Sequence, residues 1–189
     1  MFHTISKVLK LVLAFYIAAT LIGCTSPTMP QATPTQESTA GQLSYNDPFD
    51  YCAAVGTIDT PDERYNGPKM PDSIIQGMIR QGIVSADAPR EFQQNAVWRC
   101  MNKSVWVCHF GANLPCLEKA DTAQVPTSEM EDYCKTNPTL DSIPAAVTGR
   151  ATVYEWRCKD GKPEVVQQLF KVDPQGYLAD FWYELPPPK

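Results

Sequence analysis

The residues whose chemistry this sequence specifies best are the cysteines of its central and C-terminal parts. Six of the seven cysteines lie there: Cys52, Cys100, Cys108, Cys116, Cys134 and Cys158. An even number of cysteines is typical of a disulfide framework in an exported protein. Zinc is the competing use, but the chain contains no CxxC pair, and the intervals of eight residues around Cys108 match no usual zinc pattern. We therefore expect three disulfides and no metal.

Short sequences around four of these cysteines recur in the same order. Each copy has Asp-Tyr-Cys, then Asp-Ser-Ile, then Trp-Arg-Cys, at residues 50–52, 72–74 and 98–100, and again at 132–134, 141–143 and 156–158. This order favours two diverged units, each with one cysteine on a helix and one on a strand, although short cysteine-containing segments also resemble one another by chance. The sequence alone does not choose among the pairings of six cysteines. If the duplication is real, the simplest pairing is Cys52–Cys100, Cys134–Cys158 and Cys108–Cys116.

A catalytic site is not expected. His109 directly follows Cys108 on a predicted strand, where neighbouring side chains point to opposite faces, so the two do not form a nucleophile and base. No GxSxG, HExxH, phosphate-loop or dinucleotide motif occurs. The acidic groups at 62–63 and 129–132 lie in polar stretches, where solvated carboxylates are the rule. We expect no enzyme and no cofactor. The net charge of -5 also disfavours nucleic acid as a partner.

Local signals predict three short helices and five strands. The helices begin at Asp47-Pro48, at Pro71-Asp72-Ser73 and at Ser128, where Ser128-Glu129-Met130-Glu131 resembles a capping box, and they end near Val55, Gly82 and Asn137. The strands cover residues 96–101, 105–110, 151–158, 165–172 and 177–185, with turn residues between them. We expect an α+β fold in which short helices cover one face of a five-stranded antiparallel sheet.

The N-terminus has the pattern of an export signal. Lys7 and Lys10 precede an apolar segment over residues 11–22, which is shorter than the roughly 17 to 25 residues of a membrane-spanning helix. The sequence Leu-Ile-Gly-Cys at residues 21–24 resembles the lipobox of bacterial lipoproteins. That resemblance implies cleavage before Cys24 and diacylation of its thiol. The residue after Cys24 is Thr25 rather than Asp, so the resemblance also implies retention at the outer membrane, facing the periplasm. The alternative is an ordinary secretory signal with a chance cysteine.

These patterns divide the chain into four parts. Residues 1–23 are the signal peptide, 24–44 the lipidated cysteine and a Pro/Thr/Ser-rich tether, 45–185 a single disulfide-stabilised domain, and 186–189 a proline-rich tail. The lipid anchor would be the contact with the membrane.

The predicted last strand carries aromatic residues on both faces. Alternation places Tyr177, Phe181 and Tyr183 on one face and Leu178 and Trp182 on the other. One face is enough for the core, so the other could bind a partner, unless a helix or the tail covers it.

We expect a noncatalytic envelope lipoprotein whose periplasm-facing domain binds another envelope component, a protein or part of the cell wall. The aromatic-x-Cys-x-x-Gly pattern within residues 156–162 resembles the opening of membrane-bound C-type lysozyme inhibitors, which makes lysozyme one concrete partner. The alternatives are a structural lipoprotein without a discrete ligand and an unrecognised hydrolase.

Overall fold

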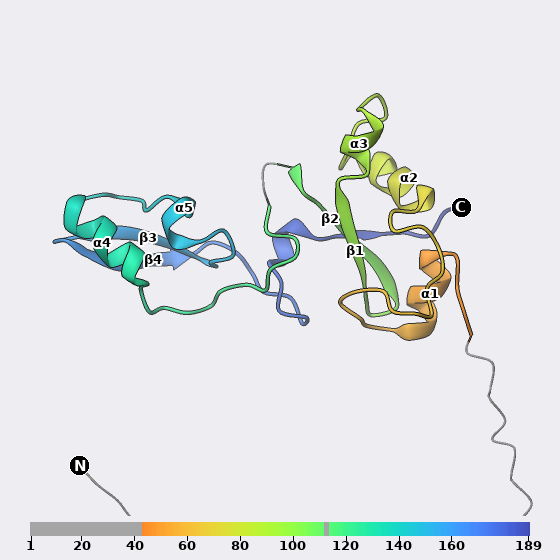
Figure 1. Ribbon diagram of the computed structural model, residues 1–189, viewed down its shortest axis with the longest axis horizontal. Coiled ribbons are helices and arrows are strands. Elements are labelled where there is room, and N and C mark those ends of the chain that lie inside the picture. The colour runs from red at the N-terminus through yellow and green to blue at the C-terminus, as the bar shows by residue number, and fades with distance from the viewer. Residues whose placement is uncertain (1–42, 112–113) are drawn as a thin grey trace, which may run out of the picture. The chain divides into compact units, whose positions relative to one another are not determined.

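The computed structural model describes residues 43–111 and 114–189 (Figure 1). The predicted signal peptide, the predicted lipidation site Cys24 and the predicted tether up to residue 42 lie outside the described residues. The elements in chain order are α1 (Pro48–Val55), α2 (Asp72–Arg80), α3 (Arg90–Gln93), β1 (Ala96–Met101), β2 (Ser104–His109), α4 (Ser128–Thr136), α5 (Ala145–Thr148), β3 (Tyr154–Lys159), β4 (Lys162–Gln168), the 3-10 helix η2 (Ala179–Phe181) and β5 (Tyr183–Leu185). No helix in the described part of the chain is long and apolar enough to cross a membrane.

The α+β class is confirmed, but the prediction of one five-stranded sheet is wrong. The strands form a three-stranded antiparallel sheet in the order β1-β2-β5 and a separate two-stranded sheet, β3-β4. The composition of β4 explains the separation. Its sequence KPEVVQQ has no buried residue, and it offers no continuous apolar face that a larger sheet could bury. Helices α1 and α2 lie beside the larger sheet, and α4 and α5 lie beside the smaller one (Figure 1).

The three predicted helices are present, and side-chain caps begin two of them, α1 and α4. The Asp47 carboxylate accepts hydrogen bonds from the backbone N–H groups of Phe49 and Asp50 at the start of α1. Thr127 caps α4 and accepts from the Met130 N–H at 3.3 Å, so this helix begins at Ser128, one residue earlier than a cap at Ser128 would place it. Helices α3 and α5 have four residues each and were not predicted.

Both hairpins are closed by two residues with positive φ. Asn102 and Lys103 (54° and 68°) join β1 to β2, and Asp160 and Gly161 (51° and 75°) join β3 to β4. Positive φ at both central positions is the type I′ turn, whose twist matches that of paired strands. The turn residues therefore fix the register of each hairpin.

The predicted strand over residues 177–185 is wrong in its first part. Residues 179–181 form the 3-10 helix η2, and only Tyr183–Leu185 pair with β2. This helical turn shifts the alternation of side chains, so Tyr177 and Trp182 pack together at a ring-centroid distance of 5.5 Å rather than facing opposite sides.

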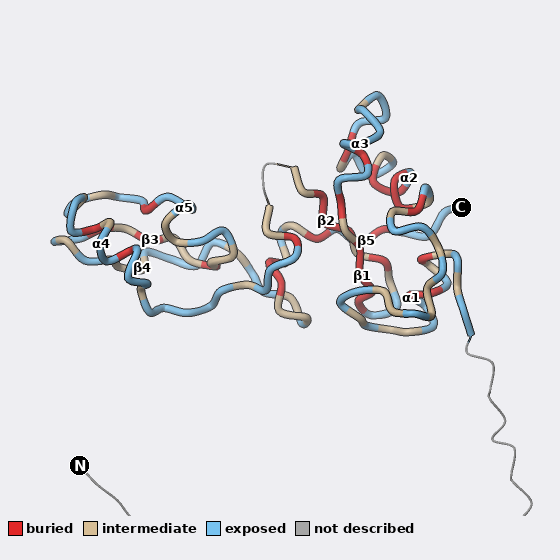
Figure 2. The backbone as a smooth tube through the Cα atoms, viewed as in Figure 1, coloured by how far each residue is buried: buried red, intermediate tan, exposed pale blue. Residues whose placement is uncertain are grey.

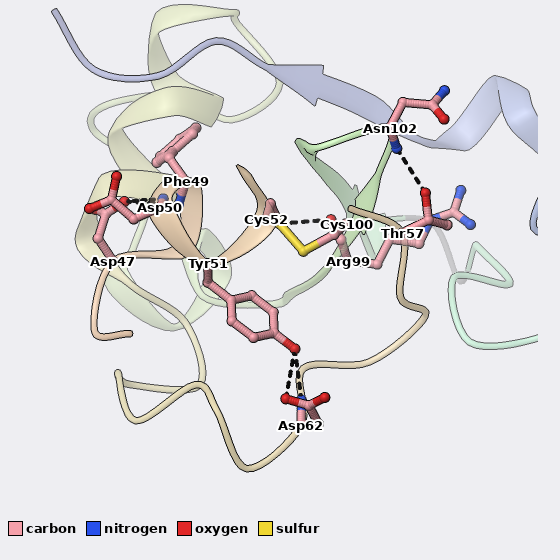
Figure 3. The surroundings of a disulfide bond; sticks show 10 residues. All are labelled: Asp47, Phe49, Asp50, Tyr51, Cys52, Thr57, Asp62, Arg99, Cys100 and Asn102. Carbon is pink, nitrogen blue, oxygen red and sulfur yellow. Dashed lines mark hydrogen bonds between the residues drawn. A yellow bond between two sulfur atoms is a disulfide. The ribbon is translucent and has the colours of Figure 1, made fainter. Parts of the chain in front are cut away.

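The three disulfides join Cys52 to Cys100, Cys108 to Cys116, and Cys134 to Cys158. They are the pairs that the repeated sequence order predicted. Figure 3 shows the first of them, which links α1 to β1.

Around the first and third disulfides, three backbone hydrogen bonds recur at equivalent positions. The sixth residue after the helical cysteine exchanges both hydrogen bonds with the strand cysteine: Ile58 with Cys100, and Leu140 with Cys158. The third residue after each strand cysteine donates to the carbonyl of the fourth residue after the helical cysteine: Lys103 to Gly56, and Gly161 to Pro138. The Asp-Ser-Ile sequences are not equivalent, because Ile74 lies within α2 whereas Ile143 precedes α5 in a non-helical segment.

Separate cores support the two sheets. The larger core joins α1 and α2 to one face of β1 and β2 through buried residues that include Tyr51, Ile75, Met78, Trp98 and Val105. The smaller core consists of Met130, Cys134, Ile143, Trp156 and Cys158. Figure 2 shows burial concentrated on β1, β2 and α2, whereas β4 is largely exposed.

Candidate binding groove at the edge of β1

The possible binding surface predicted from the sequence, the aromatic residues Tyr177, Phe181, Trp182 and Tyr183, does not form one exposed face. Tyr177 and Trp182 are buried, Phe181 is half-buried, and Tyr183 is 44% exposed on β5. Tyr177 and Trp182 instead pack on the face of β1 and β2 that α1 and α2 leave uncovered, beside the Cys108–Cys116 disulfide.

A buried arginine explains why these two aromatic rings lie there. Arg99 on β1 is fully buried, with its guanidinium carbon 4.3 Å from the ring centroid of Tyr177 and 4.0 Å from that of Trp182. Its Nη2 pairs with the carboxylate of Asp173, which is also buried. Among the described residues, its Nε and Nη1 have no hydrogen-bond partner, and the aromatic faces compensate in part. Arg99 thus holds residues 173–182 against the sheet.

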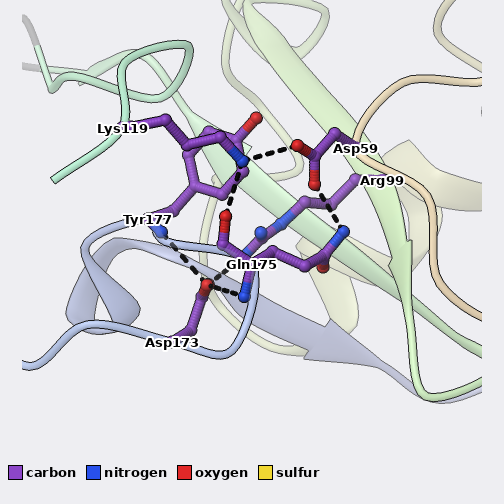
Figure 4. A network of polar contacts seen from close by, with 6 residues as sticks. All are labelled: Asp59, Arg99, Lys119, Asp173, Gln175 and Tyr177. Atoms are coloured by element: carbon purple, nitrogen blue, oxygen red, sulfur yellow. Dashed lines mark hydrogen bonds and ion pairs between the residues drawn. The ribbon is translucent and has the colours of Figure 1, made fainter.

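A second group of polar contacts ties three segments together beside Tyr177 (Figure 4). The Lys119 ammonium donates to Asp59 and to the Gln175 carbonyl, each at 2.5 Å, and lies 3.8 Å from the centroid of the Tyr177 ring. The Gln175 side chain donates to the other oxygen of Asp59 at 2.6 Å. These contacts fasten the start of the loop over residues 59–70 to the segment that carries Tyr177.

Between that loop and β1 lies a cavity of about 900 Å³, which we call the β1 groove. One wall is the loop, residues 59–62, 65 and 67–70. The floor is residues 94–98, and the other wall is Phe110, Cys116, Leu117, Tyr177 and Trp182. Trp98 belongs to the core on one face of the sheet and Trp182 to the core on the other, yet both line this cavity. The groove therefore runs along the edge of β1.

The loop wall is rigid because its acidic and aromatic residues are hydrogen-bonded. The Asp62 carboxylate accepts hydrogen bonds from the Tyr51 hydroxyl, shown in Figure 3, and from the Arg64 guanidinium. Tyr65 packs edge-on against Trp98 with ring centroids 4.9 Å apart, and the Trp98 indole donates to the Lys69 carbonyl at 3.0 Å.

Two ionisable groups of this wall have shifted pKa values. Hydrogen bonds from Arg64 lower the pKa of Asp62 from 3.8 to about 2, so this carboxylate stays charged at neutral pH. Burial raises the pKa of Tyr65 from 10.0 to about 12, so its hydroxyl stays neutral. The wall thus presents a neutral phenol beside an aspartate that is already paired.

The residues considered for catalysis lie elsewhere or are already engaged. Cys108 is in a disulfide, and the buried His109 contacts the Phe92 carbonyl at 2.8 Å through Nε2. Glu129, Glu131 and Asp132 are exposed on α4. In the described ranges, no group of three or more His, Cys, Asp or Glu residues is arranged to hold a metal ion. Asp62, the one residue of the two acidic groups that lines the groove, is hydrogen-bonded to Arg64 and Tyr51. The lining thus combines aromatic and apolar groups with polar side chains, an arrangement suited to binding.

Reasoning from sequence missed the groove because its floor and walls are far apart in the chain. The available signals were the proline-rich loop after Ile58 and the exposed Leu117 after Cys116, and neither indicates a cavity by itself. The chain matches no known protein family, and it has no detectable similarity to a curated protein or to a solved structure.

Proposed function

We propose that this protein is a noncatalytic lipoprotein of the bacterial cell envelope that binds another envelope component through the β1 groove. The observation that supports this proposal is the groove itself. Its volume of about 900 Å³ lies within the range of ligand sites, roughly 300 to 1,000 Å³, and its lining is mixed aromatic and polar.

The rigidity of the walls also supports a binding role. The Cys108–Cys116 disulfide, the Lys119–Asp59 contacts and the Arg99–Asp173 pair all hold groove-lining segments in place. A preformed site binds more tightly because less conformational entropy is lost on binding.

The proposed location rests on the lipobox-like sequence at residues 21–24. Acyl chains on Cys24 would hold the protein at the outer membrane, with the domain facing the periplasm. The Pro/Thr/Ser-rich residues from Thr25 to Gln42 would give the groove reach from that membrane.

We also infer that the two disulfide-centred units arose by duplication. The equivalent hydrogen bonds around Cys100 and Cys158, the matching disulfides and the two type I′ turns support this origin. The second unit has the two-stranded form, whereas the first also contains the long segment over residues 59–95, which includes α2 and α3, and the third strand, β5.

The binding function can be tested with two matched leucine variants of the full chain purified in detergent. Leu117 lines the groove and is 70% exposed, whereas Leu169 is 50% exposed and does not line it. Envelope extracts, and separately lysozyme, would be passed over immobilised wild type, Leu117→Ser and Leu169→Ser. We expect a component that wild type and Leu169→Ser retain and that Leu117→Ser loses. Equal retention by all three would contradict binding through the groove.

A further inference from the structure

On the floor of the β1 groove, some backbone groups have no partner among residues 43–111 and 114–189. The N–H and C=O of Cys100 both point away from β2, because both bond to Ile58. Alternate residues of a strand direct these groups to the same side, so the N–H and C=O of Trp98 also point away from β2. In the described part of the chain neither has a backbone partner, and Trp98 lines the cavity. Trp98 as a whole is 5% exposed, so this donor and acceptor of an unfinished β-ladder lie at the base of the groove.

In the second unit, the tryptophan equivalent to Trp98 has a backbone partner. Trp156 precedes Cys158 by two residues, as Trp98 precedes Cys100. The Trp156 carbonyl accepts a hydrogen bond from the Ile143 N–H at 2.7 Å. In that unit the chain continues along the edge of β3 after Leu140 and supplies a peptide N–H to the tryptophan carbonyl.

The first unit cannot supply the same group. Ile143 lies nine residues after Cys134, and the residue nine positions after Cys52 is Pro61. Proline has no N–H, and both Thr60 and Pro61 line the groove. The Trp98 carbonyl is therefore left open where the Trp156 carbonyl is paired.

Resting on the proposed function of this groove, we propose that its ligand is an extended peptide of a partner protein, which pairs as an added strand with β1 at Trp98. The added strand would continue the edge pairing that Ile58 begins at Cys100. Its alternate side chains would contact the aromatic walls on the two faces of the sheet, at Tyr65 and at Trp182.

Charge favours a basic peptide. Residues 1–42 carry Lys7, Lys10 and Glu37, a net charge of +1, so the remaining 147 residues carry -5 minus 1, or -6. Opposite charge speeds association and disfavours acidic competitors. Lysine and arginine should therefore be enriched among peptides that bind.

The probe is a phage library of random linear peptides, selected on the full chain in detergent, followed by synthesis of the enriched sequences. At a peptide concentration of about 100 times its Kd, hydrogen exchange of the Trp98 amide should slow by about a hundredfold. N-methylation scanned along the peptide should weaken binding by about tenfold at alternate positions only, because only every second N–H faces β1. Leu117→Ser should also weaken binding by about tenfold, and Leu169→Ser should not.

Failure of this inference is distinguishable from failure of the proposed function. Absence of enriched peptides, unchanged exchange at Trp98, or an N-methyl scan without a two-residue period would each overturn strand addition. If Leu117→Ser still lost its envelope component in that case, the groove would bind a glycan or lipid and the proposed function would stand. If all variants retained the component equally, the proposed function would fall as well.

Discussion

At the scale of single residues, Arg99 is the side chain on which the groove wall depends most. Its charge is buried and balanced by Asp173, whose Oδ1 also accepts from the backbone N–H groups of Gln175 and Tyr177. Removing one member of a buried pair leaves the other charge uncompensated, whereas removing both does not.

We therefore expect Arg99→Met and Asp173→Asn each to lower the free energy of unfolding by about 3 to 5 kcal/mol, as measured by urea denaturation. The double variant should lose less than the sum of the two. Asparagine keeps the oxygen that accepts from the two backbone N–H groups. The loss of stability in Asp173→Asn therefore measures the contribution of the negative charge. Single variants that each cost less than about 1 kcal/mol would show that the pair is not a structural support.

Asp62 gives the wall an acid-dependent contribution to stability. Its folded pKa of about 2 lies below the ordinary 3.8, so the unfolded state takes up the proton first as the pH falls. The stabilising contribution is complete above about pH 4 and is lost as the pH approaches 2. Urea denaturation of wild type and Asp62→Asn should show a stability difference that is constant near neutrality and shrinks in this acidic range. A difference independent of pH down to about 2 would contradict the role of Arg64 in holding the charge.

At the scale of elements, the two sheets should differ in how much they need their disulfides. A two-stranded hairpin is marginally stable alone, and the β3-β4 core has only five buried residues. The Cys134–Cys158 bond spans 24 residues and contributes about 3 kcal/mol on the chain-entropy model.

Replacing Cys134 and Cys158 by serine should therefore abolish hydrogen-exchange protection in β3 and β4 while β1 and β2 keep theirs. The matched control replaces Cys108 and Cys116, which should leave β3 and β4 protected. Simultaneous loss of protection in both sheets would show that the two cores unfold as one.

The elements also show where prediction from sequence succeeds. Helices α1, α2 and α4 and both hairpins follow from signals within a few residues, such as Asp47 before Pro48 and the Asp160-Gly161 turn. The division into two sheets and the end of the strand pattern at η2 depend on distant partners. Tyr177 and Trp182 lie together because both contact the buried Arg99, about 80 residues earlier in the chain. The alternation of side chains along a strand does not carry that information. The same long separations in sequence explain why the groove was not predicted.

At the scale of the whole molecule, the proposed membrane attachment and the proposed binding in the groove would belong to separate parts of the chain. Cleavage before Cys24 would remove Lys7 and Lys10 and no acidic residue, so the mature net charge becomes -5 minus 2, or -7. Such a chain is repelled by anionic lipid surfaces, so electrostatics cannot hold it at the membrane. Two or more acyl chains can, because each buried methylene contributes about 0.8 kcal/mol.

Replacing Cys24 by serine should therefore abolish incorporation of a labelled fatty acid and leave the precursor uncleaved at that site, as judged by mass spectrometry of the N-terminal peptide. The matched control is Cys52→Ser, which removes a cysteine from the disulfide-bonded domain and should leave acylation intact. Acylation that persists in Cys24→Ser would show that the lipid is attached to another residue. In that case the groove could still bind its ligand, but the residues from Thr25 to Gln42 would no longer be a tether, because they would have no anchor at their start.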